Sequence, residues 1–324
     1  MKRISTAPFF ASAAAPAKPF IKWAGGKGQL LEQLKQNLPP ELYSSPFTYV
    51  EPFVGGGAML FFMLQRFPNI RRAVINDINP TLVNAYRVLR SQPSALIAAL
   101  ADLERDYLAC PNYDSQKEFY LARRSTFNAN SLDDVQRTAL FIFLNRTCFN
   151  GLYRENSKGH FNVPFGRYAN PQICNRSLIE ADSRLLARID LEITQGDFEQ
   201  TADQIMPGEQ TFFYFDPPYR PLSSTSSFNS YVKEEFDDAS QRRLALFCRR
   251  LSTHPNVLWM LSNSDCSAKN PQDRFFEEIY SGFSFQRVYA SRMINANPDK
   301  RGKLTELLIS NFTQQPEPLL FASI

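Results

Sequence analysis

The sequence predicts an α/β protein built on a mostly parallel sheet, with an inserted, mainly helical segment in the middle of the chain. Two observations predict the sheet. Short apolar runs, rich in β-branched and aromatic residues, each end in a polar or acidic residue, and a helix-length apolar segment separates the first two runs. A third observation predicts the insertion, because strand–helix alternation stops between about residue 91 and about residue 190.

Four of the apolar runs are predicted to be buried parallel strands. They are residues 48–51, 73–77, 211–216 and 257–263. Residues 58–67, closed by Pro68, form the helix between the first two strands, so this stretch is predicted to be a βαβ unit.

The remaining elements of the sheet follow from the same patterns. Residues 81–90 have a helical pattern after Asn79-Pro80, and residues 191–194 are strand-like. Near the end of the chain, residues 283–289 and 304–312 are predicted to be two strands that complete the sheet as an antiparallel pair.

The inserted segment is predicted to contain at least two helices and a hairpin. Residues 94–108 and 131–145 have helical patterns, and the second begins with Ser131 and Asp134 in a spacing like that of a capping box. Residues 150–168 are rich in Asn, Gly, Arg, Lys and aromatic residues, and Lys158-Gly159 predicts a hairpin or an extended loop. Few linkers carry so many aromatic residues.

The composition is that of a globular protein in a reducing compartment. The formal net charge of +4 is compatible with a basic face for nucleic acid but does not require one. The five cysteines are scattered without a C-x-x-C pair, and the chain has two histidines, so a zinc site and a disulfide framework are both disfavoured.

The N-terminus resembles a secretory signal only superficially. Its apolar part is short and is broken by Pro8, so we expect residues 1–18 to be a disordered tail. No stretch approaches the roughly 20 apolar residues that a membrane span needs. We therefore expect a cytoplasmic protein without a membrane partner.

The strongest chemical signal follows the third predicted strand, in the segment Phe215-Asp216-Pro217-Pro218-Tyr219. Open α/β sheets bind ligands at the carboxyl ends of their strands. An aromatic amino group such as that of adenine is a poor nucleophile, and hydrogen bonds to the Asp216 carboxylate and the Pro217 carbonyl would increase its electron density. Tyr219 offers a flat face for an extruded base, while the prolines stiffen the turn. Taken alone, the pattern fits an ordinary Pro-rich turn equally well.

A glycine-rich turn follows the first predicted strand. Glycines such as Gly55 and Gly57, after Phe53, let the backbone approach a bound nucleoside, and the spacing does not match a nucleoside triphosphate loop. Asp77, at the end of the next strand, can accept hydrogen bonds from both ribose hydroxyls. A helix cap is the alternative role of Asp77.

Two further segments suit the same ligand. Trp23 and Lys27 flank a Gly-Gly turn and could contact the adenine and carboxylate ends of S-adenosylmethionine. Asp197, after residues 191–194, could accept from the adenine amino group of the cofactor, or it could cap a helix.

Together these segments resemble the alpha class of amino-methyltransferases, and specifically the Dam-like DNA adenine methyltransferases, which include those of GATC-specific restriction–modification systems. The resemblance runs from about Pro19 to Phe312 and keeps the family's order of motifs. The motifs are KWAGGK at 22–27, EPFVGGG at 51–57, NDIN at 76–79, the stretch from Leu144 to Tyr168, DPPYRPLS at 216–223, STSSFNSY at 224–231, LSNSD at 261–265, and the spaced residues Arg292, Asn297, Arg301, Lys303 and Glu306. Gly56 stands where many members have alanine, a difference that we expect to be harmless.

The resemblance implies a Rossmann-like, S-adenosylmethionine-dependent methyltransferase sheet. Residues 19–90 and 191–316 would form the catalytic domain, and residues 91–190 the target-recognition domain. The cofactor would be contacted by Trp23, Lys27, Phe53, Gly55, Gly57, Asp77, Asp197 and Asp216. The target adenine would be held by Asp216, Pro217, Pro218 and Tyr219.

The resemblance also implies that double-stranded DNA is the substrate and that the hairpin reads its sequence. The hairpin residues with this role would be Asn150, Leu152, Arg154, Pro164 and Tyr168. Arginine is the residue type best suited to guanine, because it can bond to O6 and N7 in the major groove. We expect no metal, a monomer or weak dimer on DNA, and a cognate restriction endonuclease as a candidate partner.

Three other functions can be compared with this interpretation. Methylation of an RNA adenine or a protein glutamine uses the same device, but those enzymes usually carry Asn where this chain has Asp216. The intact Asp216 and Tyr219 argue against a catalytically silent DNA-binding subunit. Scattered carboxylates and two histidines give little support to a metal-dependent nuclease.

Overall fold

The computed structural model describes residues 16–28, 30–129, 131–220, 236–290 and 304–313. Seven strands form one sheet in the order β3-β2-β1-β4-β5-β7-β6. The strands are β1 (Phe47–Glu51), β2 (Ile70–Asp77), β3 (Asp190–Gln195), β4 (Thr211–Phe215), β5 (Val257–Ser264), β6 (Ser284–Ala290) and β7 (Leu304–Ser310). The first five are parallel, and β7 pairs antiparallel with both β5 and β6, which confirms the predicted mixed sheet.

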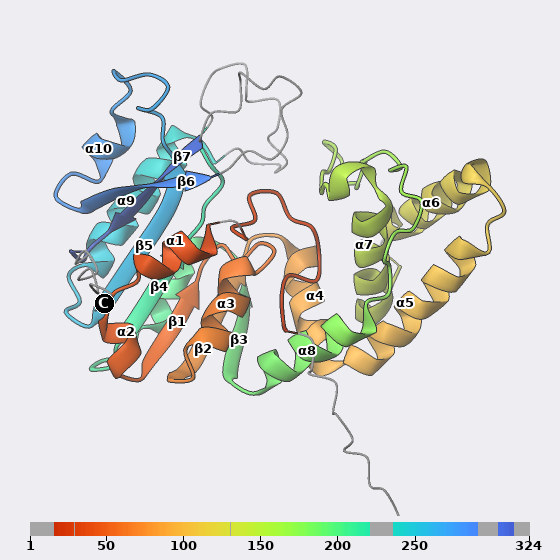
Figure 1. Cartoon of the computed structure of the whole chain (residues 1–324), viewed down its shortest axis with the longest axis horizontal. Coiled ribbons are helices and arrows are strands. Elements are labelled where there is room, and N and C mark those ends of the chain that lie inside the picture. The colour runs from red at the N-terminus through yellow and green to blue at the C-terminus, as the bar shows by residue number, and fades with distance from the viewer. Residues whose placement is uncertain (1–15, 29, 130, 221–235, 291–303, 314–324) are drawn as a thin grey trace, which may run out of the picture.

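Helices cover both faces of the sheet (Figure 1). These helices are α1 (Leu31–Gln36), α2 (Glu41–Ser44), α3 (Ala58–Arg66), α4 (Pro80–Ser91), α9 (Asp238–Leu251), α10 (Phe275–Ile279) and, from the end of the predicted insertion, α8 (Arg176–Ala187). Strand β4 shows why both faces need a cover. Phe212 and Tyr214 pack in the apolar cluster that contains α3 and α4, whereas Phe213 and Phe215 pack in the cluster that contains α9. Burial on both faces explains the continuous apolar run in the sequence.

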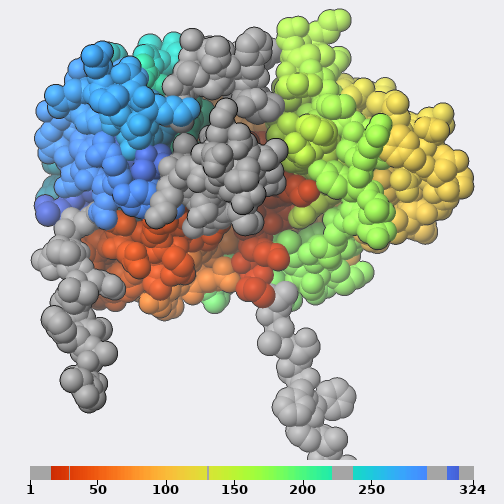
Figure 2. Space-filling model, turned by 45° about the horizontal axis from the view of Figure 1, so that its top comes forward, coloured from red at the N-terminus to blue at the C-terminus, as the bar shows by residue number. Residues whose placement is uncertain are grey.

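Three further helices of the insertion lie at one end of the sheet, opposite the β6 edge (Figures 1 and 2). They are α5 (Pro93–Leu108), α6 (Tyr113–Asn128) and α7 (Asp134–Thr147), and α7 packs against α4, α5 and α6. Their buried residues belong to the same apolar cluster as one face of the sheet, so the insertion shares a core with it. None of the helices that the structure describes is long and apolar enough to cross a membrane.

Some local predictions need correction. The capping box of α7 uses Asp133 and Gln136, because the side chain of Asp133 accepts from the Gln136 backbone, and not Ser131 and Asp134. The predicted tail extended to residue 18, but Ala17 is buried and the Lys18 backbone donates to Asp182, so the packed chain begins earlier. The sequence analysis did not predict α6, α8 or α9.

The predicted hairpin at 150–168 is held by isolated contacts rather than by a continuous ladder. Two antiparallel bridges join Cys148 to Phe165 and Glu155 to Phe161. The tip turns at Gly159, whose φ of 75° is in the left-handed region. A short 3₁₀ helix, η1 (Phe149–Gly151), leads into the hairpin from α7.

The segment 16–28, here called the N-terminal segment, crosses from the sheet to the insertion and is fixed by one buried amide. The Asn145 side chain of α7 accepts from the Lys22 backbone N–H at 2.8 Å and donates to the Lys22 carbonyl at 2.8 Å. It also donates to the Gly151 carbonyl at 2.9 Å. Asn145 thus ties the N-terminal segment to the base of the hairpin.

We predict that Asn145→Ala lowers the free energy of unfolding by about 2–4 kcal/mol, because three backbone groups lose a buried partner. Urea denaturation with an unchanged m-value measures the loss. The matched control is Asn84→Ala, whose half-buried side chain donates to the Asp134 carbonyl and the Thr138 hydroxyl, and this variant should lose less than about 1 kcal/mol. Equal losses in the two variants would contradict the role given to Asn145.

Candidate active site

The predicted site residues converge at the carboxyl edge of the parallel strands. The glycine turn follows β1, Asp77 ends β2, Asp197 follows β3 and Asp216 follows β4. Parallel pairing places these strand ends at one edge, with Asp77 opposite Gln195 and Phe215 opposite Leu261. The sheet therefore brings together four side chains or turns that are distant in the sequence, where open α/β sheets bind ligands.

The turn after β1 has a conformation that requires glycine. Gly55 and Gly57 have φ angles of 48° and 76°, and a Cβ on Gly57 would lie 2.4 Å from the Tyr86 hydroxyl oxygen. That hydroxyl donates to the Gly55 carbonyl at 3.0 Å. Gly56 was expected to be a neutral difference, but a Cβ there would lie 2.9 Å from the Trp23 Cβ. Gly56 therefore lets the N-terminal segment approach the turn closely in this chain.

Asp77 is joined to the glycine turn by its carboxylate. Oδ2 accepts from the Gly55 backbone N–H at 3.1 Å, and Oδ1 accepts from the Asn79 N–H at 2.9 Å. Burial raises the pKa of Asp77 to about 6, although both hydrogen bonds oppose the rise. Asn79 is the residue that caps α4, so the helix-cap role considered for Asp77 belongs to Asn79. Asp77 itself is half-buried.

Asn76, which the sequence analysis did not single out, holds the edge together. Its buried side chain donates to the carbonyls of Pro52 at 3.1 Å and Gly196 at 3.0 Å, and accepts from the Thr194 hydroxyl at 2.9 Å. One amide thus links the turns that follow β1 and β3. In the sequence, Asn76 was recorded within the NDIN motif at 76–79 but was given no role of its own.

Asp197 caps the 3₁₀ helix η2 (Phe198–Gln204), as the alternative role predicted. One carboxylate oxygen accepts from the Glu199 backbone N–H at 3.0 Å, and the other pairs with Arg243 of α9. The next residue, Phe198, lies beside Phe53 with ring centroids 5.4 Å apart. Phe198 is buried, whereas Phe53, in the turn after β1, is half-buried, so Phe53 is the ring of this pair that remains partly accessible.

Asp216, the first residue after β4, is paired with a buried lysine. The Lys27 ammonium lies 2.7 Å from Asp216 Oδ1, with side-chain exposures of 4% for Lys27 and 21% for Asp216. Burial raises the pKa of Asp216 to about 6, Lys27 opposes this rise, and the charge of Glu306 adds to it. Among the described residues, none donates a hydrogen bond to the second oxygen, Oδ2.

Tyr219 is fixed through its hydroxyl. The hydroxyl donates to Glu306 Oε2 of β7 at 2.6 Å and lies 2.7 Å from the Ser262 hydroxyl of β5. The Lys27 ammonium lies 4.4 Å from the centroid of the Tyr219 ring. The sequence analysis recorded Glu306 within a family motif but gave it no role, and Ser262 was not distinguished from its neighbours in LSNSD.

The turn after β4, which carries Asp216 and Tyr219, is also held by α9 and by the loop before α10. The Pro218 carbonyl accepts from Gln241 of α9 at 3.0 Å, whereas the Pro217 carbonyl has no donor among the described residues. Arg220 donates to Asp238 at 2.7 Å and to Asp273 at 2.7 Å, which ties the end of the turn to α9 and to the loop before α10. The turn is therefore fixed by side chains of three other elements, while Asp216 Oδ2 and the Pro217 carbonyl have no donor among the described residues.

The five predicted DNA-reading residues all lie on the hairpin. Asn150 is exposed with a φ of 55°, Pro164 is exposed, and Leu152 and Tyr168 are half-buried. The Lys22 ammonium lies 4.7 Å from the Tyr168 ring centroid. Arg154 is exposed and donates to the side chain of Asn162 at 2.7 Å, so its guanidinium bonds within the hairpin in this DNA-free structure.

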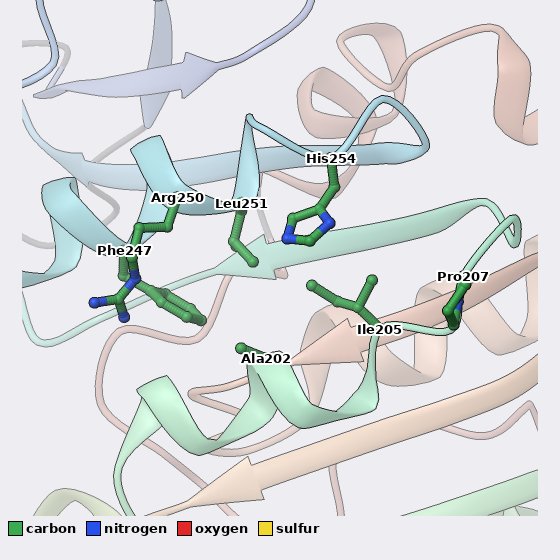
Figure 3. A pocket seen from close by; sticks show the side chains of 7 residues that line it. All are labelled: Ala202, Ile205, Pro207, Phe247, Arg250, Leu251 and His254. Carbon is green, nitrogen blue, oxygen red and sulfur yellow. The ribbon is translucent and has the colours of Figure 1, made fainter.

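The described ranges contain no cluster of three or more His, Cys, Asp or Glu side chains that could hold a metal ion. A pocket of about 360 Å³ opens at the amino ends of β4 and β5, away from the carboxylates (Figure 3). It is lined by Ala202, Ile205, Pro207, Phe247, Arg250, Leu251 and His254.

Comparison with known proteins agrees with the geometry of this edge. Residues 23–294 match the model of the D12 class N6 adenine-specific DNA methyltransferases. The chain is 46% identical over 299 residues to the Type II methyltransferase M.MjaIII of Methanocaldococcus jannaschii, covering 91% of this chain and 99% of that protein. It is 40% identical to the Type II methyltransferase M1.LlaDCHI of Lactococcus lactis, over 91% of this chain and 95% of the other. The DNA adenine methylase of Haemophilus influenzae is 33% identical, over 90% of this chain and 92% of that protein.

Proposed function

Because the chain belongs to the D12 class of N6 adenine-specific DNA methyltransferases, we propose that it methylates the adenine of GATC in double-stranded DNA at the edge around Asp216. One observation carries the site assignment. Asp216 Oδ2 and the Pro217 carbonyl are two acceptors on one rigid turn, and neither has a donor among the described residues. The two hydrogens of an exocyclic amino group match two such acceptors.

The residues at the edge fit the methyl donor of this class, S-adenosylmethionine. When bound, it supplies a methyl group on a positively charged sulfur. The Asp77 carboxylate accepts from the backbone N–H groups of Gly55, Asn79 and Ile78, and because a carboxylate has about four acceptor sites, it can still accept from a ribose hydroxyl. The glycine turn allows close backbone approach, and Phe53 borders the same space. We propose that these residues, with Trp23 and Asp197, hold the donor.

The target adenine is proposed to bind between the Asp216 turn and the Tyr219 ring. Its amino lone pair is delocalised into the ring, so hydrogen bonds from N6 to Asp216 and Pro217 localise it and stabilise the positive charge that develops as the methyl group arrives. Pro217 and Pro218 have no backbone N–H that could compete for these acceptors. A base must leave the duplex to reach them, and a fixed aromatic ring provides a stacking surface for the extruded base.

Recognition of GATC is proposed to come from the hairpin at 150–168. Arg154 is exposed, and its bond to Asn162 can be exchanged for the O6 and N7 atoms of a guanine. Two relatives are Type II methyltransferases, which supports a cognate restriction endonuclease as a partner of this chain. The enzyme is proposed to act in the cytoplasm, as a monomer or as a weak dimer on DNA.

We predict that the purified chain transfers label from S-adenosylmethionine to a duplex that contains one GATC site. Duplexes with one substituted base pair in the site should react at least about fivefold more slowly, because each lost bidentate or apolar contact costs about 1–3 kcal/mol. Initial rates at fixed salt measure this preference. Equal rates on all the duplexes would rule out GATC recognition while leaving adenine methylation intact.

Asp216→Ala should reduce the rate of methyl transfer by about 10²–10³, because a preorganised acceptor for the developing charge is lost. Binding of S-adenosylmethionine, followed by calorimetry, should change much less than the rate. Asp203→Ala, at an exposed aspartate of η2, serves as the matched control and should retain wild-type activity. An Asp216→Ala enzyme with more than half the wild-type rate would show that the catalytic assignment is wrong.

Arg154→Ala should lose about 1–3 kcal/mol of discrimination at one G·C pair of the site, while the other positions remain selective. Competition between GATC and singly substituted duplexes measures the loss. Lys158→Ala, at the exposed tip of the same hairpin, is the control. This variant should weaken binding to all the duplexes by the same factor or leave binding unchanged. An unaltered preference in Arg154→Ala would exclude it as the guanine reader.

A further inference from the structure

Lys27 lies against the predicted catalytic residues rather than beside the glycine turn. Its ammonium contacts Asp216 Oδ1 at 2.7 Å, donates to the Gly25 carbonyl at 3.0 Å and covers the Tyr219 ring at 4.4 Å. Lysine is rarely buried this completely unless its charge is paired. The resemblance assigns Lys27 to the cofactor, but in the structure the carboxylate nearest to its ammonium is Asp216, in the turn after β4.

Glu306 completes a buried cluster of three charges. Its Oε2 lies 4.0 Å from the Lys27 ammonium and accepts hydrogen bonds from the Tyr219 hydroxyl at 2.6 Å and the Ser262 hydroxyl at 3.3 Å. One ammonium therefore lies near two carboxylates. Loss of the ammonium would leave two like charges close together in a desolvated site, where one of them would take up a proton.

From these contacts we propose that Lys27 and Glu306 are positioning residues for methyl transfer. Lys27 keeps Asp216 ionised and occupies Oδ1, so that Oδ2 is presented to the adenine amino group. Glu306 holds Lys27 and fixes the Tyr219 ring through its hydroxyl. The inference rests on the proposed role of Asp216 as the acceptor from adenine.

The other titratable groups around Asp216 cannot replace Lys27 in this role. The groups that act on Asp216 electrostatically are Lys27 of the N-terminal segment, Tyr49 and Glu51 of β1, Tyr214 of β4, Tyr219, and Glu306 of β7. Lys27 carries the positive charge in this set. Burial raises the pKa of Glu51 well above its usual range, and the Tyr49 hydroxyl, which donates to Glu51 at 2.7 Å, opposes that rise.

The arrangement has a direct consequence for pH dependence. Only the ionised form of Asp216 has both oxygens free of protons, so methyl transfer should slow as pH falls through the pKa of Asp216, about 6. Removing the positive charge of Lys27 raises that pKa and moves the acid limb of the rate profile to higher pH. Removing the negative charge of Glu306 lowers it and moves the limb to lower pH.

The test is single-turnover methylation of a GATC duplex at saturating S-adenosylmethionine, measured from about pH 5 to about pH 9. Lys27→Met should slow transfer at neutral pH by about tenfold or more and move the acid limb upward by about one unit or more, since a close opposite charge shifts a carboxyl pKa by about 1–3 units. Lys27→Arg should restore the limb because it keeps the charge. Glu306→Gln should move the limb in the opposite direction.

A cofactor-binding role for Lys27 makes a different prediction. It would raise the dissociation constant of S-adenosylmethionine in Lys27→Met, measured by calorimetry, while the acid limb at saturation stayed in place, and that result would overturn our inference. If Lys27→Met fails to fold, the Glu306→Gln variant tests the inference instead. An acid limb of the pH–rate profile that stays in place in Glu306→Gln would equally contradict the inference. An active Asp216→Ala would instead overturn the proposed function, so the two failures are distinguishable.

Discussion

The ion pair between Lys27 and Asp216 is the contact on which the arrangement of the active edge depends. It joins the N-terminal segment to the turn after β4, and both partners lie at a desolvated edge where unpaired charges would be costly. The same segment places Trp23 against the glycine turn and is held by Asn145 at the base of the hairpin. One short segment therefore contacts the glycine turn, the turn after β4 and the base of the hairpin.

Burial on both faces of β4 produces the electrostatics of this methyltransferase. Phe212 and Tyr214 pack on one face of this strand, and Phe213 and Phe215 pack on the other, so water is excluded from both faces. Asp216 follows directly and therefore lies at the edge of an apolar layer. Burial raises the pKa of Asp216 to about 6, and burial at the end of β2 has the same effect on Asp77. Under the proposed function, the charge of these carboxylates acts strongly on a positively charged methyl donor because water is excluded.

Much of the sheet could be predicted because buried parallel strands leave a strong local signature. The runs that became β1, β2, β4 and β5 are apolar and end in polar residues, and the order of motifs placed the glycine turn, Asp77 and Asp216 at one edge. Helix α6 was missed because its sequence is largely polar, and only Tyr120 and Phe127 in it are fully buried. The capping box of α7 was assigned two residues too early, since Ser131 and Asp133 are both plausible caps.

The contacts of the active edge are less predictable because they join distant positions in the sequence. Nothing local in the sequence shows that Lys27 pairs with Asp216 or that Glu306 accepts from Tyr219. The most direct test of the proposed function is single-molecule sequencing of unmethylated plasmid after incubation with the purified chain and S-adenosylmethionine. We predict N6-methyladenine, concentrated at GATC. Methyl groups on cytosine N4, or a plasmid left unmodified, would contradict the proposed function.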